Sequence, residues 1–245
     1  IVLDNLKETG NLKYLDILTF HPYTSYPEKK KSQIKALKEF AANYSPTIKL
    51  VAGESGYISD LYVRNQKEST ELIQAKWVLR QMAMEFGLGN PTSIFSMVDN
   101  IYPDRMQSYG MIRTNLLKET VYKRPSFYSF RNLASMLNAG FHSNGDLKFT
   151  TKSDGKFCAV SICHQGKTVG LLIWRSQAAP DNNLQKDTID VTFDDLFLSD
   201  VVYADPMTGR IYEYSSYKNT KKGFSVKQLP IWDSPIILIE KTAMK

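Results

Sequence analysis

The chain has 245 residues, of which 42% are hydrophobic and 23% charged, and this composition is that of a globular protein rather than a disordered one. Its 31 basic and 25 acidic residues give a net charge of +6, but the two basic clusters, at 28–35 and 219–223, lack the interleaved aromatic residues of a stacking platform. We therefore expect no nucleic-acid partner. No apolar run approaches the roughly 18–20 residues of a membrane span, so no membrane insertion is expected either.

The part of the chain before Gly140 alternates between apolar strand-like runs and helical patterns. The predicted order is strand, helix, strand, helix, strand, helix, over residues 14–23, 28–44, 47–54, 69–87, 91–99 and 125–139. Ser69 or Thr70 is expected to begin the second helix, and Gly87 and Gly89 are expected to end it. Three strand–helix units in succession predict parallel strands, and the nearly continuous apolar character of these strands predicts cover on both faces.

The pattern after Gly140 is that of short strands joined by turns. The sequences "SDGK" at 153–156 and "HQGK" at 164–167 predict hairpins, and "DPMTGR" at 205–210 predicts another turn. About 100 residues of this kind are typical of a β-sandwich or small barrel. Cys158 and Cys163 lie five residues apart in one strand-like run, on opposite faces, so no mutual disulfide is expected. The predicted fold class is thus α/β plus all-β, with domains at 1–140 and 141–245.

One short stretch, "LVAGESGY" at 50–57, ends an apolar run in a serine between glycines. The nucleophile elbow of serine hydrolases needs Gly-x-Ser-x-Gly, because its glycines allow a sharp strand-to-helix turn. Gly53 and Ser55 fit this pattern, but Tyr57 occupies the last glycine position. His142 and His164, the nominal bases, lie in or near the all-β part. A serine-hydrolase function is therefore not favoured.

Glu54 is a better candidate, because it ends a predicted parallel strand, where barrel enzymes carry their catalytic groups. A glutamate that caps the next segment or pairs with an arginine is the open alternative. His21 and Tyr23 end the preceding strand in an equivalent place and point to one side, although a lone histidine is more often structural. Phe95 and Asp99 end the third strand, and an aromatic ring beside a carboxylate suits a sugar platform as well as ordinary core and loop.

Three successive strand ends read "DILTFHPY", "LVAGESGY" and "SIFSMVD", and "YKRPSFYSFRNLASML" follows them. In this order they resemble the last three strands and the final helix of retaining glycoside hydrolases built on a TIM barrel. "VKQLPIWDSPIILIE" is similar to the end of the β-sandwich appended to many of these enzymes, including the β-xylosidase-like families. The resemblance implies that Glu54 is the nucleophile, that His21 and Tyr23 position it or contact sugar, and that Phe95, where the family usually has Trp, floors the sugar subsite.

The resemblance also implies an incomplete barrel, the last three β/α units packed on a C-terminal antiparallel β-sandwich. The family's acid/base glutamate, normally preceded by Asn, has no counterpart, and only Asp99 and Asp60 are acids that could substitute. Because a retaining glycosidase needs two carboxyl groups, we expect the isolated chain to be an inactive, truncated piece. Its exposed strand edges would be covered by the missing N-terminal half of the barrel or by another chain.

These interpretations define the expected partners. The substrate would be a carbohydrate, and no cofactor or metal is expected, since the three histidines lack metal-ligand spacing. A secreted or periplasmic location follows from the resemblance alone. The main alternative is a non-catalytic carbohydrate-binding or scaffolding protein with the same fold. A further alternative is an unrelated α/β-plus-sandwich interaction module.

Overall fold

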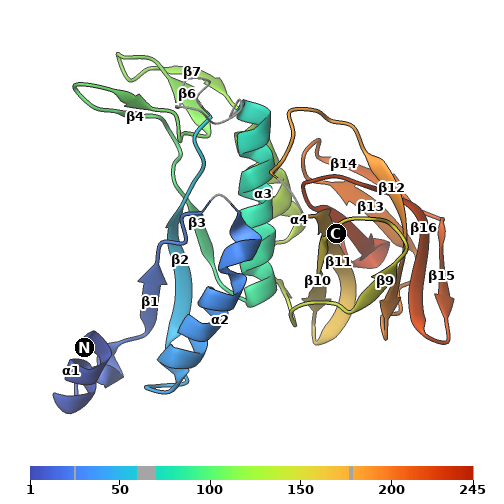
Figure 1. The fold of residues 1–245 in the computed structure, drawn as a ribbon, viewed down its shortest axis with the longest axis horizontal. Helices are drawn as coiled ribbons and strands as arrows, with labels where there is room; N and C mark the ends of the chain where they lie inside the picture. Colours follow the sequence, from blue (N-terminus) through green and yellow to red (C-terminus); the bar gives the residue numbers. More distant parts are fainter. Residues whose placement is uncertain (25, 60–69, 177–178, 245) are drawn as a thin grey trace.

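The structure is a computed structural model that describes residues 1–24, 26–59, 70–176 and 179–244. Its N-terminal part contains three parallel strands in the order β1-β2-β3, so the predicted parallel direction is confirmed (Figure 1). The elements of this part are α1 (Val2–Glu8), η1 (Leu12–Tyr14), β1 (Ile17–Phe20), α2 (Pro27–Ala42), β2 (Lys49–Ser55), α3 (Glu71–Leu88), β3 (Thr92–Ile94), β4 (Asn100–Ile101), β5 (Met106–Gln107), β6 (Ile112–Thr114), β7 (Thr120–Lys123) and α4 (Pro125–Met136).

Helix α3 begins and ends close to the predicted places. The Thr70 hydroxyl accepts a hydrogen bond of 3.2 Å from a backbone N–H of the first turn, while Ser69 lies outside the described residues. Gly89 ends the helix in the left-handed conformation, at φ +70°. Gly87, predicted as a stop, lies inside the last turn, where an added Cβ would come 2.5 Å from Val160 Cγ1. This glycine lets α3 approach the neighbouring strand closely.

Helices α2 and α3 cover one face of the parallel sheet. Ala41 of α2 packs with Leu50 of β2, and Ile34 of α2 packs with Met84 of α3 beside Phe20. The expected cover on both faces is wrong for the described chain, because β1 has no buried residue and β2 alternates between buried and half-buried residues over most of its length. An apolar pattern shows what a strand can bury, not whether another element lies over it.

Residues after α4 form two antiparallel sheets, of six strands (β14-β13-β17-β11-β10-β8) and four strands (β15-β16-β12-β9). Phe193, Leu171 and Leu238 belong to one core that both sheets share. Cys158 and Cys163 are free thiols, as expected. The elements are β8 (Phe141–His142), β9 (Phe149–Thr151), β10 (Phe157–His164), β11 (Lys167–Arg175), β12 (Asp187–Asp194), β13 (Val201–Asp205), β14 (Arg210–Glu213), β15 (Tyr217–Thr220), β16 (Gly223–Ile231), β17 (Ile236–Glu240) and η2 (Lys241–Ala243).

Two turn sequences of this part were predicted to form hairpins, and one of these two predictions is confirmed. "HQGK" joins β10 to β11 as a hairpin that pairs His164 with Lys167, and both Gln165 (φ +50°) and Gly166 (φ +77°) have the positive φ of a type I′ turn. The hairpin predicted at "SDGK" is wrong, because β9 pairs with β12 in one sheet whereas β10 pairs with β11 in the other. Turn residues indicate a local change of direction, and they do not determine which strand each flanking segment pairs with.

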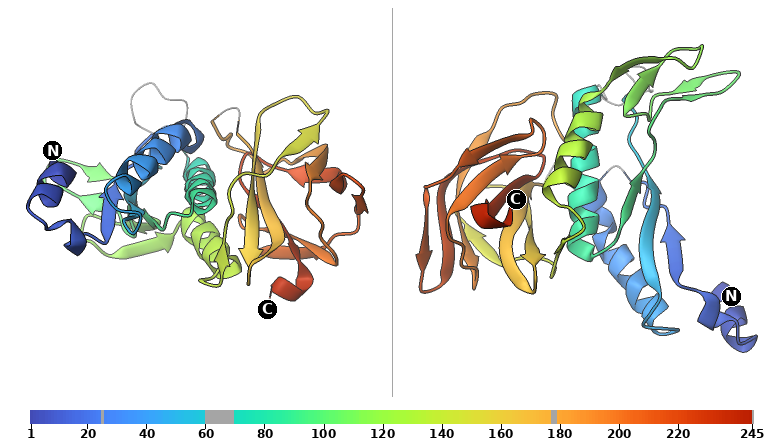
Figure 2. Two further views of the ribbon diagram at one scale, coloured as in Figure 1. Left: turned by 90° about the horizontal axis from the view of Figure 1, so that it is seen from below. Right: turned by 180° about the vertical axis from the view of Figure 1, so that it is seen from behind.

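Helices α3 and α4 lie between the parallel sheet and the antiparallel sheets, as both views of Figure 2 show. Buried ion pairs tie α3 to its surroundings. The fully buried Arg80 binds both carboxylate oxygens of Glu28 at 2.7 and 2.8 Å, and the Trp174 indole N–H donates to the same carboxylate at 2.7 Å. Lys76, also buried, lies 2.7 Å from Asp233. These contacts hold the parallel strands in a fixed place relative to the antiparallel sheets.

Candidate functional site

The parallel strands bring side chains together at their carboxyl ends. His21 and Tyr23 follow β1, Glu54 lies near the end of β2, and Phe95 follows β3. Parallel strands end at the same edge of a sheet, so residues distant in sequence meet there. With Tyr109, which lies between β5 and β6, these four residues form what we call the strand-end cluster.

Glu54 is the centre of the cluster. Its side chain is 36% exposed, and the Tyr23 hydroxyl donates a hydrogen bond of 2.7 Å to its Oε1. Burial and this bond to the carboxylate raise the pKa of Tyr23 above its usual value, so the phenol keeps its proton and remains a donor. The His21 Nδ1 lies 3.9 Å from Glu54 Oε2, beyond hydrogen-bond distance. Among the described residues, one oxygen of the carboxylate is therefore held by a hydrogen bond and the other accepts none.

Aromatic rings line the cluster on the side of β3. The Tyr109 ring makes edge contacts with both Phe95 and Tyr23, at centroid distances of 5.5 and 6.3 Å. Burial, and then the charge of Glu54, raise the pKa of Tyr109. The sequence interpretation missed Tyr109, because its loop has no periodic pattern; a tyrosine next to Gly110 in a loop rich in Tyr, Pro and Gly was the only available signal.

Close backbone contacts explain why glycines stand on both sides of Glu54. A Cβ on Gly56 would lie 1.8 Å from the Phe95 carbonyl oxygen, so only glycine allows the end of β2 to approach the segment after β3. The Phe95 N–H donates to the Ser55 carbonyl at 2.7 Å across this approach. A Cβ on Gly53 would come within 3.3 Å of the Thr19 Cβ. The "GESG" sequence therefore brings β2 close to both neighbouring strands beside Glu54.

Ser55 has no hydrolase arrangement around it. It is 1% exposed, its hydroxyl has no hydrogen-bond partner among the described residues, and strand alternation turns it away from the Glu54 side. His142 and His164 lie on β8 and β10, where the two strands pair with each other in the six-stranded sheet. The structure thus gives Ser55 neither of the bases that the sequence offered.

Asp99 lies apart from the strand-end cluster in a buried ion pair. Arg124 donates to its two carboxylate oxygens at 2.7 and 3.1 Å, and the backbone N–H groups of Gly110 and Thr114 donate at 3.1 and 3.3 Å. Both side chains of the pair are fully buried. This carboxylate holds the loop that carries Tyr109, and the substrate-binding role predicted for it is untested. Asp60, the other acid nominated from sequence, lies outside the described residues.

The described residues also bear on metal binding and on membrane insertion. Over residues 1–24, 26–59, 70–176 and 179–244, no group of three or more His, Cys, Asp or Glu side chains could hold a metal ion. None of the helices in these ranges is long and apolar enough to cross a membrane.

No protein-family model and no curated relative matches the chain. Among solved structures, a family 39 glycoside hydrolase from Bacteroides cellulosilyticus WH2 is similar with a TM-score of 0.58 and 15% identity, over 97% of this chain and 47% of that one. A glucosidase from Croceicoccus marinus has a TM-score of 0.46 and 15% identity, over 94% and 42% of the two chains. An arabinofuranosidase has a TM-score of 0.45 and 11% identity, over 97% and 54%.

The chain thus has a glycoside hydrolase-like fold and spans about half the length of these structures. The likeness to the family 39 enzyme carries this conclusion, since the other two TM-scores are lower. The described sheets include no closed barrel.

Proposed function

We propose that this chain is the C-terminal part of a retaining glycoside hydrolase whose catalytic domain is a TIM barrel, and that Glu54 is its nucleophile. The observation that carries the proposal is the Glu54 carboxylate at the carboxyl end of β2, held by Tyr23 at 2.7 Å. In barrel enzymes the catalytic groups lie at this end of the strands. The glycoside hydrolase-like fold, matched over 97% of the chain, is the supporting context.

The proposed chemistry is a double displacement. One oxygen of Glu54 attacks the anomeric carbon and forms a glycosyl ester, while the glycosidic C–O bond breaks and the leaving oxygen takes a proton from an acid. Water then attacks the same carbon and releases the carboxylate. The hydrogen bond from Tyr23 holds Oε1 in place and leaves Oε2 for the attack. Phe95 and Tyr109 would offer ring surface to the sugar.

The acid of this reaction would come from a part of the complete protein that precedes this chain. Retaining enzymes place their two carboxyl groups roughly 5–5.5 Å apart. Asp99, one of the two acids nominated from sequence, has both oxygens bonded to Arg124. We therefore propose that the isolated chain is inactive. Within the described residues, β1 and β3 pair only with β2, and their outer edges would be covered by the remainder of the barrel or by another chain. Secretion or a periplasmic location is proposed with this activity.

Mechanism-based labelling of the complete protein tests the proposal. A 2-fluoro glycoside stalls the reaction at the glycosyl ester, and peptide mapping then finds the labelled residue. We expect the label on Glu54, no label in Glu54→Gln, and normal labelling in Glu39→Gln, which makes the same change on the exposed face of α2. A label on another carboxylate would refute the assignment.

A non-catalytic carbohydrate-binding function is the second candidate. The observation that favours it is that the described contacts of the Glu54 carboxylate, with Tyr23 and His21, include no second carboxylate. Glycan binding that survives Glu54→Gln, in a complete protein without turnover, would support this alternative. Turnover that Glu54→Gln abolishes would exclude it.

A further inference from the structure

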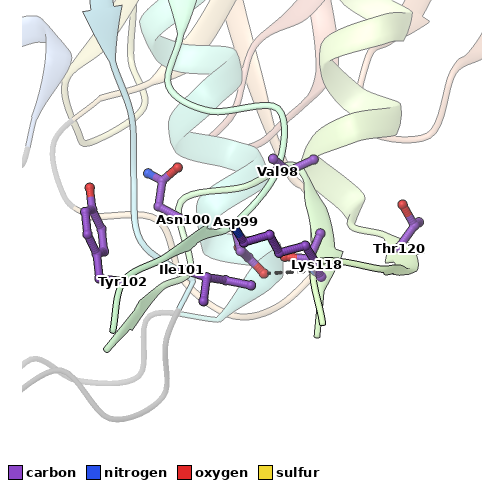
Figure 3. Close-up of a pocket in the computed structure, with 8 residues that line it drawn as sticks. Val98, Asp99, Asn100, Ile101, Tyr102, Lys118 and Thr120 are labelled. Atoms are coloured by element: carbon purple, nitrogen blue, oxygen red, sulfur yellow. Dashed lines mark hydrogen bonds between the residues drawn. The ribbon is translucent and has the colours of Figure 1, made fainter. Parts of the chain in front are cut away.

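A pocket of about 330 Å³ lies between the two small hairpins, β4–β5 and β6–β7, which project beyond the carboxyl ends of the parallel strands (Figures 1 and 3). This volume is at the small end of the range for ligand pockets, roughly 300–1,000 Å³. The residues that line it are Val98, Asp99, Asn100, Ile101, Tyr102, Thr114, Lys118 and Thr120. In Figure 3, Asn100 and Tyr102 lie on one side of Asp99, and Lys118 and Thr120 lie on the other.

The charge of the pocket comes from Lys118. Asp99, the one acid in the lining, is neutralised by Arg124 at 2.7 Å, and Arg113 lies 3.8 Å from it. Within the described part of the chain, Lys118 is exposed and forms no ion pair. The lining therefore presents a cation without a counter-ion, which favours an anionic ligand.

Two buried polar groups of the pocket wall have no hydrogen-bond partner among the described residues. One is the hydroxyl of Thr114, which is 4% exposed, and the other is the side-chain amide nitrogen of the half-buried Asn100. Unpaired buried polar groups cost free energy, so a ligand that supplies hydrogen-bonding oxygens beside them would gain from their presence. Thr120 adds an exposed hydroxyl, and Tyr102, 43% exposed, adds an aromatic surface.

The small pocket offers groups that can form hydrogen bonds with sugar hydroxyls, an aromatic side chain and one cation. These features suit a sugar ring that carries an acidic group. We propose that this pocket, which we call the hairpin pocket, binds an anionic sugar unit of the glycan. The inference deepens the proposed function, because it assigns a charge class to the substrate. The acidic group, a carboxylate or a sulfate, would pair with Lys118, and the ring hydroxyls would meet Thr114, Asn100 and Thr120.

Calorimetric titration of the 245-residue chain tests the proposal with three probes: an oligogalacturonate, a sulfated galactan oligomer and a neutral xylo-oligosaccharide. We expect at least one anionic oligomer to bind more tightly than the neutral one. Lys118→Gln should weaken that binding about threefold to fivefold, since exposed ion pairs contribute up to about 1 kcal/mol, and added salt should reduce the difference. Comparison of the two anionic probes distinguishes a carboxylate from a sulfate.

Two further variants make the test specific. Lys123→Gln removes the same charge from the same hairpin but from a lysine that lies over the Phe127 ring and not in the pocket lining, so binding should not change. Thr114→Val removes the unpaired hydroxyl at nearly constant shape, and it should weaken binding without loss of folding stability.

The possible failures are distinguishable. Binding that prefers neutral oligomers, or that Lys118→Gln and Lys123→Gln change equally, overturns the hairpin pocket and leaves the assignment of Glu54 intact. Lys118-dependent binding of an anionic oligomer, together with labelling of a residue other than Glu54, would retain the pocket and refute the proposed nucleophile.

Discussion

The buried carboxylate of Glu85, on α3, predicts that the stability of the folded chain depends on pH. Glu85 is fully buried, and its carboxylate accepts hydrogen bonds from the side-chain amides of Gln81, at 3.0 Å, and Asn90, at 2.9 Å. None of the ion pairs in the described chain involves this carboxylate. Burial raises the pKa of Glu85 from 4.5 to about 7, although the two amide hydrogen bonds act in the opposite direction.

The stability of the folded chain must therefore depend on pH. Because the pKa of Glu85 is higher in the folded state than in the unfolded state, the folded state binds the proton more tightly. Its contribution is intact below pH 4.5 and is lost as the pH rises to about 7. This rise of the pKa corresponds to roughly 3 kcal/mol of unfolding free energy, most of which is lost between about pH 5 and about pH 8.

Glu85→Gln removes this ionisation with little change of shape. The Asn90 side-chain oxygen has no hydrogen-bond partner in the described part of the chain, so a flip of the Asn90 amide would present this acceptor to the new amide of the variant. We expect the unfolding free energy of Glu85→Gln to rise by about 2–3 kcal/mol relative to that of the original chain between about pH 5 and about pH 8. Urea unfolding across this range measures it, with Glu39→Gln, an exposed helical glutamate, as the matched control.

The result that would refute this reasoning is a constant difference in unfolding free energy between Glu85→Gln and the original chain at all pH values. A change of the same size in Glu39→Gln would also refute it, because the pH dependence would then belong to solvent-exposed carboxylates in general.

Three further predictions concern the candidate site and its support. Tyr23→Phe should slow 2-fluoro glycoside labelling of Glu54 in the complete protein about tenfold, because the carboxylate loses its 2.7 Å donor; an unchanged rate would contradict this. Gly56→Ala should lower the urea unfolding free energy by about 1–3 kcal/mol, because its Cβ would meet the Phe95 carbonyl; a change below about 0.5 kcal/mol would contradict the close approach. Thr70→Ala should cost about 1 kcal/mol in the same assay through the lost cap of α3, whereas Thr70→Ser should cost little.

The N-terminal topology could be predicted from the sequence, because its main signals are local. Strand-like runs that alternate with amphipathic patterns specify parallel pairing through the crossover rule, and parallel pairing places His21, Tyr23 and Glu54 at one edge. The hydrogen bond from Tyr23 to Glu54 is a consequence of that topology. Tyr109 could not be predicted in the same way, because it comes from a loop whose path is set by tertiary contacts.

Buried charges are the other feature that periodicity cannot predict. Helix α3 carries Lys76, Arg80 and Glu85, whose residue types are almost never fully buried unless they are paired, yet all three are buried. Their cover comes from segments far along the chain, including Trp174, whose indole N–H shares Glu28 with Arg80. The pattern of one helix cannot contain this information for Lys76 and Arg80, since their carboxylate partners lie on other segments of the chain.

Asp99 shows how the same limit affects a functional assignment. From sequence Asp99 is a carboxylate at the end of a predicted strand, as Glu54 is, and it is one of the two acids that could substitute for the acid/base glutamate. The difference lies in the group that contacts each carboxylate. The phenol of Tyr23 bonds to one oxygen of Glu54, whereas the guanidinium of Arg124 bonds to both oxygens of Asp99. A carboxylate whose two oxygens are both engaged by a buried guanidinium cannot attack a sugar without breaking a buried ion pair, at a cost of several kcal/mol. Of the two, only Glu54 has an oxygen without a hydrogen-bond partner among the described residues, and the proposed attack by Glu54 requires such an oxygen.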